Sequence, residues 1–386
     1  MGEKIMKKYF VLIVTILALF VSCSKKAGSV TDPNEKEETN IKGFWMWGST
    51  LSDQGTDIVV QKLADNFAKD VFLLVKGIAG TKTSATILKD FISKAHTKDI
   101  KIHLWYVVNS DDKFFSTHPD ASIYHCPKPS IGYPDPYPMN DGRINPLYPG
   151  YKQYVLDNIR YFLTNFDCDG IHLDYIRYSH FVYSFDKYHL QKADSLGCNT
   201  ERLLNFFVNN YDYYAYNEGF VDLFSSGDTD VVKWVELRKN VVYDYISSVK
   251  DLINQIKPDI LFSASFMPEG ATDPAWADSY YSQNYTLNSS LLDLIIPMSY
   301  FKDYGKNTDW PKTVAEKAID LVDSSCKIAP GLQCYNGVTA KQLEEQIVSA
   351  NEAGLFDMVI FRYGAASEEQ WAVIKEYFKD TDENEK

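Results

Sequence analysis

The residues best suited to chemistry lie in one short stretch, residues 169–178, which reads Asp-Gly-Ile-His-Leu-Asp-Tyr-Ile-Arg-Tyr. Two apolar residues alternate there with His172 and Asp174, and alternate side chains of a strand share a face. The pattern predicts a short buried strand with two ionisable side chains on one face. A carboxylate at the end of a buried strand is costly unless something uses it. We therefore expect Asp174 to be a catalytic carboxylate, tuned by Arg177 or Tyr175.

A structural interpretation of the same carboxylate stays open at this point. Asp174 would then cap the segment that follows it and pair with Arg177. The catalytic interpretation depends on the fold, because the C-terminal ends of the strands carry the catalytic residues in a (β/α)8 barrel. The rest of the chain must supply such a barrel.

Apolar runs and helical stretches alternate along the chain after residue 40. The predicted strands are residues 42–47, 70–76, 100–107, 171–174, 259–266, 292–300, 327–332 and 356–362. The predicted helices are residues 58–68, 83–98, 151–166, 231–256, 310–323, 339–353 and 367–378. Eight repeats over about 340 residues favour an α/β fold of the (β/α)8 TIM-barrel class. A doubly wound open sheet competes, but it usually has fewer strands and a glycine-rich first turn that is absent here.

Three long insertions follow strands three, four and five of this barrel. They cover residues 109–150, 178–230 and 268–290 and are rich in proline or aromatic residues. All follow strands, so all emerge at the catalytic face, where aromatic loops build a cleft wall. Alternatively, many of these aromatic side chains form a satellite core beneath the loops.

Composition excludes some partners and favours others. The chain has 386 residues, a formal net charge of -13 and a sequence pI near 5.0. Nucleic acids and acidic polymers prefer basic surfaces, so neither is expected as the main partner. The 27 Tyr, 22 Phe and 7 Trp supply rings that stack on sugars or fill a core. No cysteine pair has metal-like spacing, and neither a metal nor another cofactor is expected.

The N-terminal segment is typical of an exported lipoprotein. Residues 1–9 carry three lysines, residues 10–20 are apolar, and Val-Ser precedes Cys23. This pattern predicts a signal peptide over residues 1–22 that is cleaved before a lipidated Cys23. An ordinary signal peptide with an incidental cysteine is the alternative.

The segment that follows predicts the domain organisation and the location. Residues 23–40 are polar and charged and cannot bury a core, so they form a disordered tether. A barrel domain is expected over residues 41–380. The protein would then be lipid-anchored in the cell envelope, in the outer membrane with a mild preference for its periplasmic face. Its oligomeric state is not predicted.

The strand-four stretch resembles the signature of the glycosyl hydrolase-like 10 family of bacterial (β/α)8-barrel lipoproteins. Further similarities are Asn145-Pro146 before a helix, Trp234 with Arg238 on the helix after strand four, and the Pro-Met-Ser-Tyr run that ends at Tyr300. The resemblance covers about residues 40–380 and implies an exported barrel that hydrolyses glycosidic bonds, with bacterial wall glycan as one substrate class. Many members carry a second Asp where this chain has Tyr175, so the second carboxylate must come from elsewhere.

Hydrolysis of a glycosidic bond needs two carboxyl groups. One stabilises or attacks the anomeric carbon, and the other protonates the leaving oxygen. We assign Asp174 to the first role. For the second we choose Glu269, which follows strand five, and Asp303 after strand six is the runner-up. As a loop residue, Glu269 is equally compatible with a solvated position.

The remaining candidates support these two carboxylates. Residues expected to contact substrate are Trp47, Lys76, Trp105, Tyr106, Asn145, Tyr175, Arg177, Tyr300, Tyr335 and Arg362. For Trp105 a place in the core is an equal alternative. Arg238 is expected to reach Asp174 from its helix and to lower the pKa of that carboxyl. His172 lies in or near the barrel, and with Asp174 it makes only two potential metal ligands, too few for a site.

Together these features predict a lipid-anchored glycoside hydrolase that acts on an oligo- or polysaccharide. The first alternative is a non-catalytic glycan-binding lipoprotein on the same scaffold. A metal-dependent deacetylase is the second alternative, and it lacks a third ligand. The hydrolase interpretation requires that Asp174 and a second carboxylate lie in the same site.

Overall fold

The computed structural model describes residues 40–379 of the chain. The predicted signal peptide, the lipidation site at Cys23 and the tether up to residue 39 lie outside the described residues. In the part that is described, no helix combines the length and the apolar composition needed to cross a membrane.

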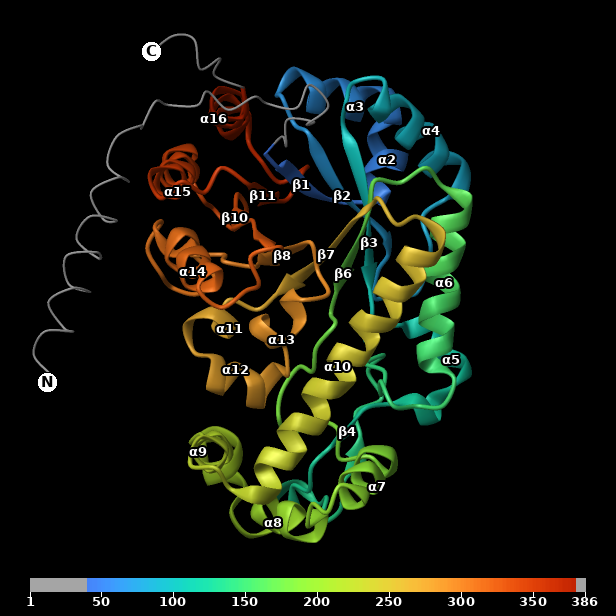
Figure 1. The fold of residues 1–386 in the computed structure, drawn as a ribbon, viewed down its shortest axis with the longest axis vertical. Helices are drawn as coiled ribbons and strands as arrows, with labels where there is room; N and C mark the ends of the chain where they lie inside the picture. The colour runs from blue at the N-terminus through green and yellow to red at the C-terminus, as the bar shows by residue number, and fades with distance from the viewer. Residues whose placement is uncertain (1–39, 380–386) are drawn as a thin grey trace, which may run out of the picture. The chain divides into compact units, whose positions relative to one another are not determined.

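The centre of the fold is one parallel sheet with strand order β10-β11-β1-β2-β3-β6-β7-β8-β9 (Figure 1). Its strands are β1 (Lys42–Trp47), β2 (Asp70–Lys76), β3 (Lys101–Val107), β6 (Gly170–Asp174), β7 (Leu261–Phe266), β8 (Leu294–Pro297), β9 (Lys327–Ile328), β10 (Gly331–Gln333) and β11 (Met358–Phe361). Each predicted strand is present, with bounds that differ by a few residues at most ends.

The two end strands of this sheet are pieces of one predicted strand, residues 327–332. β9 pairs with β8, and β10 pairs with β11, so the two pieces join the two ends of the sheet. Between them, Ala329 donates to Ile295 and Pro330 accepts from Val359. Proline has no amide hydrogen for the ladder, which explains the interruption. Nine strands therefore fill eight barrel positions, and the predicted TIM-barrel class is confirmed.

Amphipathic helices surround the barrel (Figure 1). They are α3 (Thr56–Asp65), α4 (Ala85–His96), α6 (Tyr151–Asn165), α10 (Thr229–Ile256), α14 (Trp310–Ile319), α15 (Ala340–Glu352) and α16 (Glu368–Phe378). All correspond to predicted helices. The short helix α2 (Ser49–Gln54) was not predicted from the sequence.

The alternation of side chains along the strands divides the core into two layers. Phe44 and Met46 of β1 point outward into the large core between strands and helices. Trp45, between them, points inward and packs with Phe72 and Trp105 inside the barrel. Period-two alternation in the sequence thus determines which side chains can reach the mouth of the barrel.

The three insertions contain most of the remaining elements. The first holds α5 (Asp112–Thr117), β4 (Tyr124–His125), β5 (Tyr137–Pro138) and two short 3-10 helices, η1 (Pro119–Ala121) and η2 (Pro129–Ile131). The second holds α7 (Lys187–Ser195), α8 (Thr200–Tyr216) and α9 (Gly219–Ser225), and the third holds α11 (Glu269–Thr272), α12 (Pro274–Tyr281) and α13 (Tyr285–Ser289). The first two insertions extend the lower end of the molecule in Figure 1.

Several aromatic residues of the second insertion form a satellite core. Phe181 stacks on Phe220 with ring centroids 5.1 Å apart, and Phe185 stacks on Trp234 of α10 at 4.7 Å. All four side chains are buried. The alternative interpretation of the insertion aromatics is therefore correct for these residues, which cannot contact a ligand.

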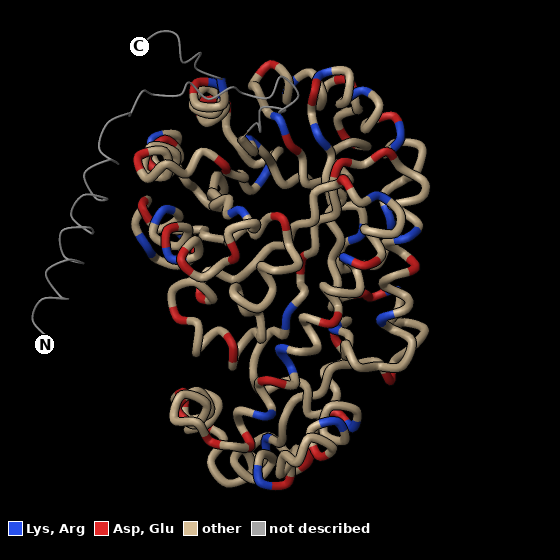
Figure 2. The backbone as a smooth tube through the Cα atoms, in the orientation of Figure 1, with Lys and Arg blue, Asp and Glu red and all other residues tan. Residues whose placement is uncertain are grey.

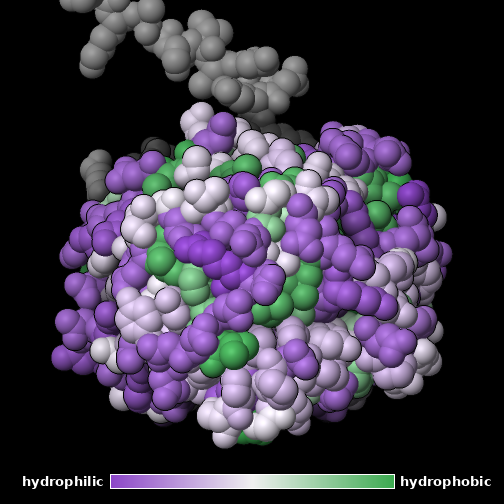
Figure 3. Space-filling view, turned by 90° about the horizontal axis from the view of Figure 1, so that it is seen from below, coloured by the Kyte–Doolittle hydropathy of each residue, from purple (hydrophilic) through white to green (hydrophobic). Residues whose placement is uncertain are grey.

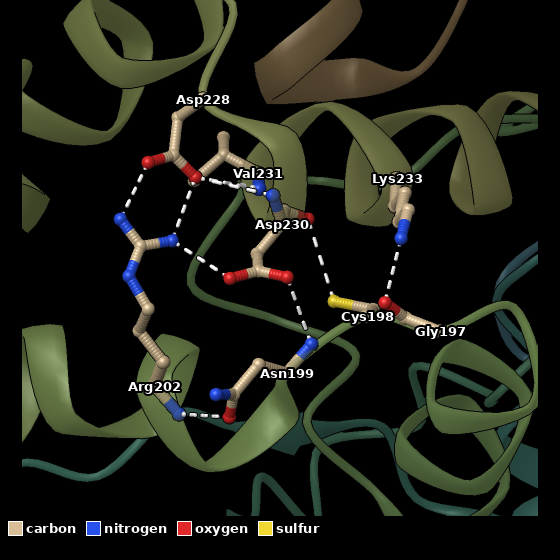
Figure 4. A network of polar contacts seen from close by, with 8 residues as sticks. All are labelled: Gly197, Cys198, Asn199, Arg202, Asp228, Asp230, Val231 and Lys233. Atoms are coloured by element: carbon tan, nitrogen blue, oxygen red, sulfur yellow. Dashed lines mark hydrogen bonds and ion pairs between the residues drawn. The ribbon is translucent and has the colours of Figure 1, made fainter.

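An ionic network joins the start of α8 to the start of α10 (Figure 4). Arg202 donates to Asp228 and Asp230, with Nη1–Oδ distances of 2.8 Å to each, and the amide of Asn199 donates to Asp230 at 2.9 Å. The hydrogen bond from Arg202 is the main reason that the pKa of Asp228 is lowered. These contacts fix the second insertion on the long helix.

Surface charge does not distinguish one end of the barrel from the other. Lys, Arg, Asp and Glu are interspersed along the outer helices (Figure 2). The end that carries the insertions is mainly hydrophilic, with separate hydrophobic patches (Figure 3). The five cysteines of the described residues are free and buried.

Candidate active site

Asp174 ends β6 on the inner face of the barrel, and its side chain is buried. Trp105 Nε1 donates to Oδ2 at 3.1 Å. The Tyr175 amide donates to Oδ1 at 2.7 Å, and Arg177 Nη1 donates to the same oxygen at 3.3 Å. Three donors therefore fix the orientation of this side chain. The structural interpretation predicted that Asp174 pairs with Arg177, and this pair is present. The pair is also compatible with a catalytic role for Asp174.

The backbone turns sharply after Asp174. Tyr175 has a φ of 53°, in the left-handed region that side chains larger than glycine rarely adopt. Its ring is partly exposed, and the guanidinium of Arg177 lies 4.7 Å from the ring centroid. The turn thus holds Arg177 beside the carboxylate that precedes it by three residues.

Glu269 is the first residue of α11, directly after β7, and it is partly buried. Tyr304 donates its hydroxyl to Oε2 at 3.3 Å. Burial raises the pKa of Glu269, although the hydrogen bond from Tyr304 and the charge of Arg177 act in the opposite direction. A carboxyl group with a raised pKa is suited to donate a proton.

Arg177 connects the two carboxyl groups. It forms an ion pair with Asp174 and also acts electrostatically on Glu269. The two predicted residues thus share the influence of one cation and differ in their environments. Such a difference is the usual basis for assigning one carboxyl group as base or nucleophile and the other as acid.

Aromatic rings surround this position. Tyr300 lies 5.4 Å from Phe361 and 5.8 Å from Tyr335, and Trp105 lies 6.4 Å from Phe361. Trp105 of this group also donates to Asp174, so the ring group and the carboxylate are close. Rings in this arrangement can stack on the apolar faces of a sugar.

Asp303, the second choice for the acid, has a different environment. It is exposed and accepts hydrogen bonds from Gln333 at 2.9 Å, from Asn336 at 3.0 Å and from the hydroxyl of Tyr335. Burial opposes ionisation, but these donors outweigh it and hold the pKa of Asp303 below its usual value. Asp303 is therefore a poor proton donor, and Glu269 is the better choice.

Trp47 and Arg362 form a pair at the ends of β1 and β11. The guanidinium carbon lies 3.4 Å from the centroid of the indole ring. Trp47 is 41% exposed and also lines a cavity of about 460 Å³. Both predicted residues are thus accessible at the mouth of the barrel.

Lys76 and Tyr106 lie on the outer face of the barrel instead of at its mouth. A bulge in β2 sets Lys76 opposite Tyr106 of β3, and Tyr106 points toward α6, where Asn158 donates to its hydroxyl at 3.2 Å. Lys76 is fully buried, pairs with Asp111 at 2.9 Å, and has a pKa lowered by burial to about 8. The expected substrate contacts of both residues are not possible in this arrangement, because a bulge re-aims the side chains that follow it.

Two further candidates are buried and bound to backbone groups. Arg238 is buried on α10 and donates to the backbone oxygens of Ser279, His180 and Tyr280. The predicted contact of Arg238 with Asp174 is therefore wrong, and Arg238 instead ties the second insertion to the third. Asn145 is buried, and its Oδ1 accepts from the amide of Leu147 at 2.9 Å, a turn contact before α6.

His172 lies deep inside the barrel. Its ring nitrogens are within 2.9 Å of Ser263 Oγ and 2.8 Å of Ser265 Oγ, and Trp45 Nε1 donates to Nε2 at 3.2 Å. Burial holds its pKa well below the usual value. His172 is thus a neutral, hydrogen-bonded core residue beneath the site. Residues 40–379 contain no cluster of three or more metal-ligating side chains.

Two residues of the site were not singled out from the sequence. Tyr304 contacts Glu269, and Phe361 joins the ring group at the end of β11. Phe361 could have been found from its inward register on a predicted strand. Tyr304 lies next to the predicted Asp303, but its contact depends on a loop that no periodicity describes.

Comparisons with known proteins agree with this fold. The family model described as Glycosyl hydrolase-like 10 matches residues 71–352, as the resemblance in the sequence implied. A search of curated proteins finds no match.

Solved structures show a similar fold at very low sequence identity. The PgaB (BpsB) glycoside hydrolase domain from Bordetella bronchiseptica has a TM-score of 0.70 at 9% identity, over 89% of this chain and 100% of that one. A β-galactosidase from the psychrophilic Marinomonas ef1 has a TM-score of 0.61 at 10% identity, over 87% of this chain and 58% of that one. An α-L-fucosidase from Paenibacillus thiaminolyticus has a TM-score of 0.56 at 12% identity, over 88% and 49% of the two chains. At this identity the likeness shows the fold alone.

Proposed function

Because this chain belongs to the glycosyl hydrolase-like 10 family, we propose that it hydrolyses glycosidic bonds with Asp174 and Glu269 as its two carboxyl groups. The observation that carries the proposal is the contrast between them. Asp174 accepts three hydrogen bonds, whereas burial raises the pKa of Glu269, and Arg177 acts on both. The glycosidases among the similar structures support the same reaction class.

The proposed reaction has two steps. Asp174 attacks or stabilises the anomeric carbon as positive charge develops there, and Glu269 donates its proton to the leaving oxygen as the glycosidic bond breaks. Glu269 then takes a proton from a water molecule whose oxygen bonds to the anomeric carbon, so the second sugar is released and both carboxyl groups return to their starting forms. Arg177 holds Asp174 in place through their ion pair. Tyr300, Tyr335 and Phe361 present rings to the sugar.

The experiment that tests this proposal is turnover on a panel of polysaccharides, including bacterial wall glycan strands, followed by reducing-end release. Asp174→Asn and Glu269→Gln should each lower kcat by about 10²–10⁴-fold on a cleaved glycan. Asp303→Asn serves as the matched control, because Asp303 is exposed and its carboxylate already accepts hydrogen bonds from the protein. This variant should retain most of the activity. Equal losses in Glu269→Gln and Asp303→Asn would remove Glu269 as the acid.

A non-catalytic glycan-binding protein is the second candidate. Arg177 occupies one oxygen of Asp174, and Tyr175 stands where many family members have a second Asp. Binding of a glycan without turnover, with equal affinity in wild type and Asp174→Asn, would favour this candidate.

We also propose export and lipid anchoring through Cys23, on the sequence pattern alone. Palmitate labelling of wild type and Cys23→Ala, with fractionation of the cell envelope, tests this. Loss of label and release from the membrane in Cys23→Ala are expected. Unchanged membrane association without label would contradict the anchor.

A further inference from the structure

A cavity of about 460 Å³ lies beside the candidate active site, where β1 and β2 end. Trp47 and Gly48 line it from β1, and the loop of residues 77–84 lines it from β2. The backbones approach closely here: a Cβ on Gly48 would lie 2.2 Å from Thr83 Oγ1 and 2.6 Å from the Leu74 oxygen. The close approach of these loops shapes a pocket that the proposed reaction does not yet use.

The lining has the chemistry of a sugar site. It contains one indole and several hydroxyl side chains, which are Ser49, Ser52, Thr81, Thr83 and Ser84. An aromatic ring with hydroxyls around it suits the apolar face and the polar edge of a pyranose. No Asp or Glu is among the lining residues, although the chain carries 52 of them.

One cation stacks on the indole, and a second lines the cavity. Arg362 covers one face of Trp47, so a ligand in the cavity meets the remaining face and edge. No carboxylate of residues 40–379 pairs with Arg362, which donates a long hydrogen bond of 3.5 Å to the Tyr363 oxygen.

The second cation, Lys82, lines the cavity from the β2 loop. Lys113 adds a further positive charge near it. The carboxylate that acts on Lys82 is Asp111, which is already bound to the buried Lys76. Lys82 and Lys113 thus place positive charge beside this loop, and Lys82 Nζ lies 4.7 Å from the ring centroid of Tyr161 on α6.

We propose that this cavity is a subsite for an anionic sugar residue, one that carries a carboxylate, sulfate or phosphate group. The sugar ring packs on Trp47, and its anionic group is attracted by Arg362 and Lys82. The inference rests on the proposed glycan-directed function, and it narrows the substrate class to acidic glycans. Trp47 connects the cavity to Arg362, which follows Phe361 of the ring group in the chain.

The test is equilibrium binding of small probes, measured by ligand-observed NMR at one constant ionic strength. The probes are glucose, glucuronate, glucose 6-sulfate and glucose 6-phosphate. The proteins are wild type, Trp47→Ala, Arg362→Gln and Arg160→Gln. Arg160 is exposed on α6 and provides a control that removes the same charge elsewhere. Thermal unfolding of each variant checks that it is folded.

At least one anionic probe should bind wild type about 10-fold more tightly than glucose does. Arg362→Gln should reduce this preference to less than about 3-fold, Trp47→Ala should weaken every probe, and Arg160→Gln should change nothing. Equal affinity for glucose and all anionic probes would overturn the inference. So would an equal loss in Arg160→Gln, which would indicate general surface charge.

These outcomes are independent of turnover. If the chain binds anionic probes but cleaves no glycan, the proposed hydrolysis fails and the subsite stands. If it cleaves a neutral glycan and shows no preference for anionic probes, the subsite fails and the hydrolysis stands.

Discussion

Lys76 and Asp174 lie at the C-terminal ends of two strands that flank β3, and their side chains point to opposite sides of the sheet. Lys76 lies opposite Tyr106 of β3, whereas Asp174 lies opposite Val107, the next residue. Neighbouring residues of a strand face opposite sides, so Lys76 points outward to the helices and Asp174 points into the barrel mouth. One extra residue in β2 thus decides whether a charged strand end becomes part of the framework or part of the site.

The two side chains also differ in how their charge is compensated. Lys76 is enclosed by Asp111 and by the backbone oxygens of Val107 and Ser110, at 2.9 Å and 2.7 Å. Asp174 has the long side chain of Arg177 on one of its oxygens, and 14% of that side chain is exposed, against none of Lys76. A substrate can displace a side chain of that kind, but it cannot reach the buried pair.

Replacement of Lys76 tests the framework half of this comparison and carries the largest expected effect on stability. Lys76→Met leaves Asp111 buried without its cation, and it should lower the free energy of unfolding by about 3–5 kcal/mol. Urea denaturation measures this. The double variant Lys76→Met/Asp111→Asn should recover much of the loss, because no charge is left unpaired and Asn can still cap α5.

The activity of the Lys76 variants decides whether Lys76 only supports the fold or also contacts substrate. The folded fraction of Lys76→Met should keep its kcat on any glycan that wild type cleaves. Normal stability with lost substrate binding would instead place Lys76 in the site, as the sequence predicted.

Removal of one donor to Asp174 tests the site half of the comparison and has the next largest effect. Trp105→Phe keeps a ring in the barrel but loses the hydrogen bond to Oδ2. A hydrogen bond to a charged group contributes about 1.5–3 kcal/mol, so kcat should fall by about 10–100-fold. Steady-state kinetics measure the loss.

Trp45→Phe is the matched control for this change. It also removes one indole donor inside the barrel, but its acceptor is the neutral His172. Its kcat should stay within about 3-fold of wild type, since a bond between neutral groups contributes less. Equal losses in both variants would indicate that packing, and not the bond to Asp174, supports activity.

Sequence patterns predicted the framework well and the orientation of the strand ends less well. Apolar runs such as residues 70–76 and 100–107 located every strand of the barrel, and Asp174 was placed correctly on its inner face. The bulge that re-aims Lys76 has no sequence signal, because it is set by pairing with β3. Arg238 was predicted to reach Asp174, but its neighbours are loop carbonyls whose positions depend on tertiary packing. Pro330 marked the break between β9 and β10, yet it was read as part of one strand.

A change next to Glu269, the second carboxyl group of the site, extends the comparison and has the smallest expected effect on activity. Tyr304 donates to Glu269, and this bond opposes the rise in pKa that burial causes. An acid catalyst must be protonated, so activity should fall as pH rises through the raised pKa of Glu269.

Tyr304→Phe removes a contact that favours the ionised form, so the pKa of Glu269 should rise further and the alkaline limb of kcat/KM should move to higher pH. The maximal rate should change by less than about 10-fold, because the removed bond is a long one. A limb that moves to lower pH, or one that stays in place while Asp303→Asn moves it, would show that Glu269 is not the group that titrates.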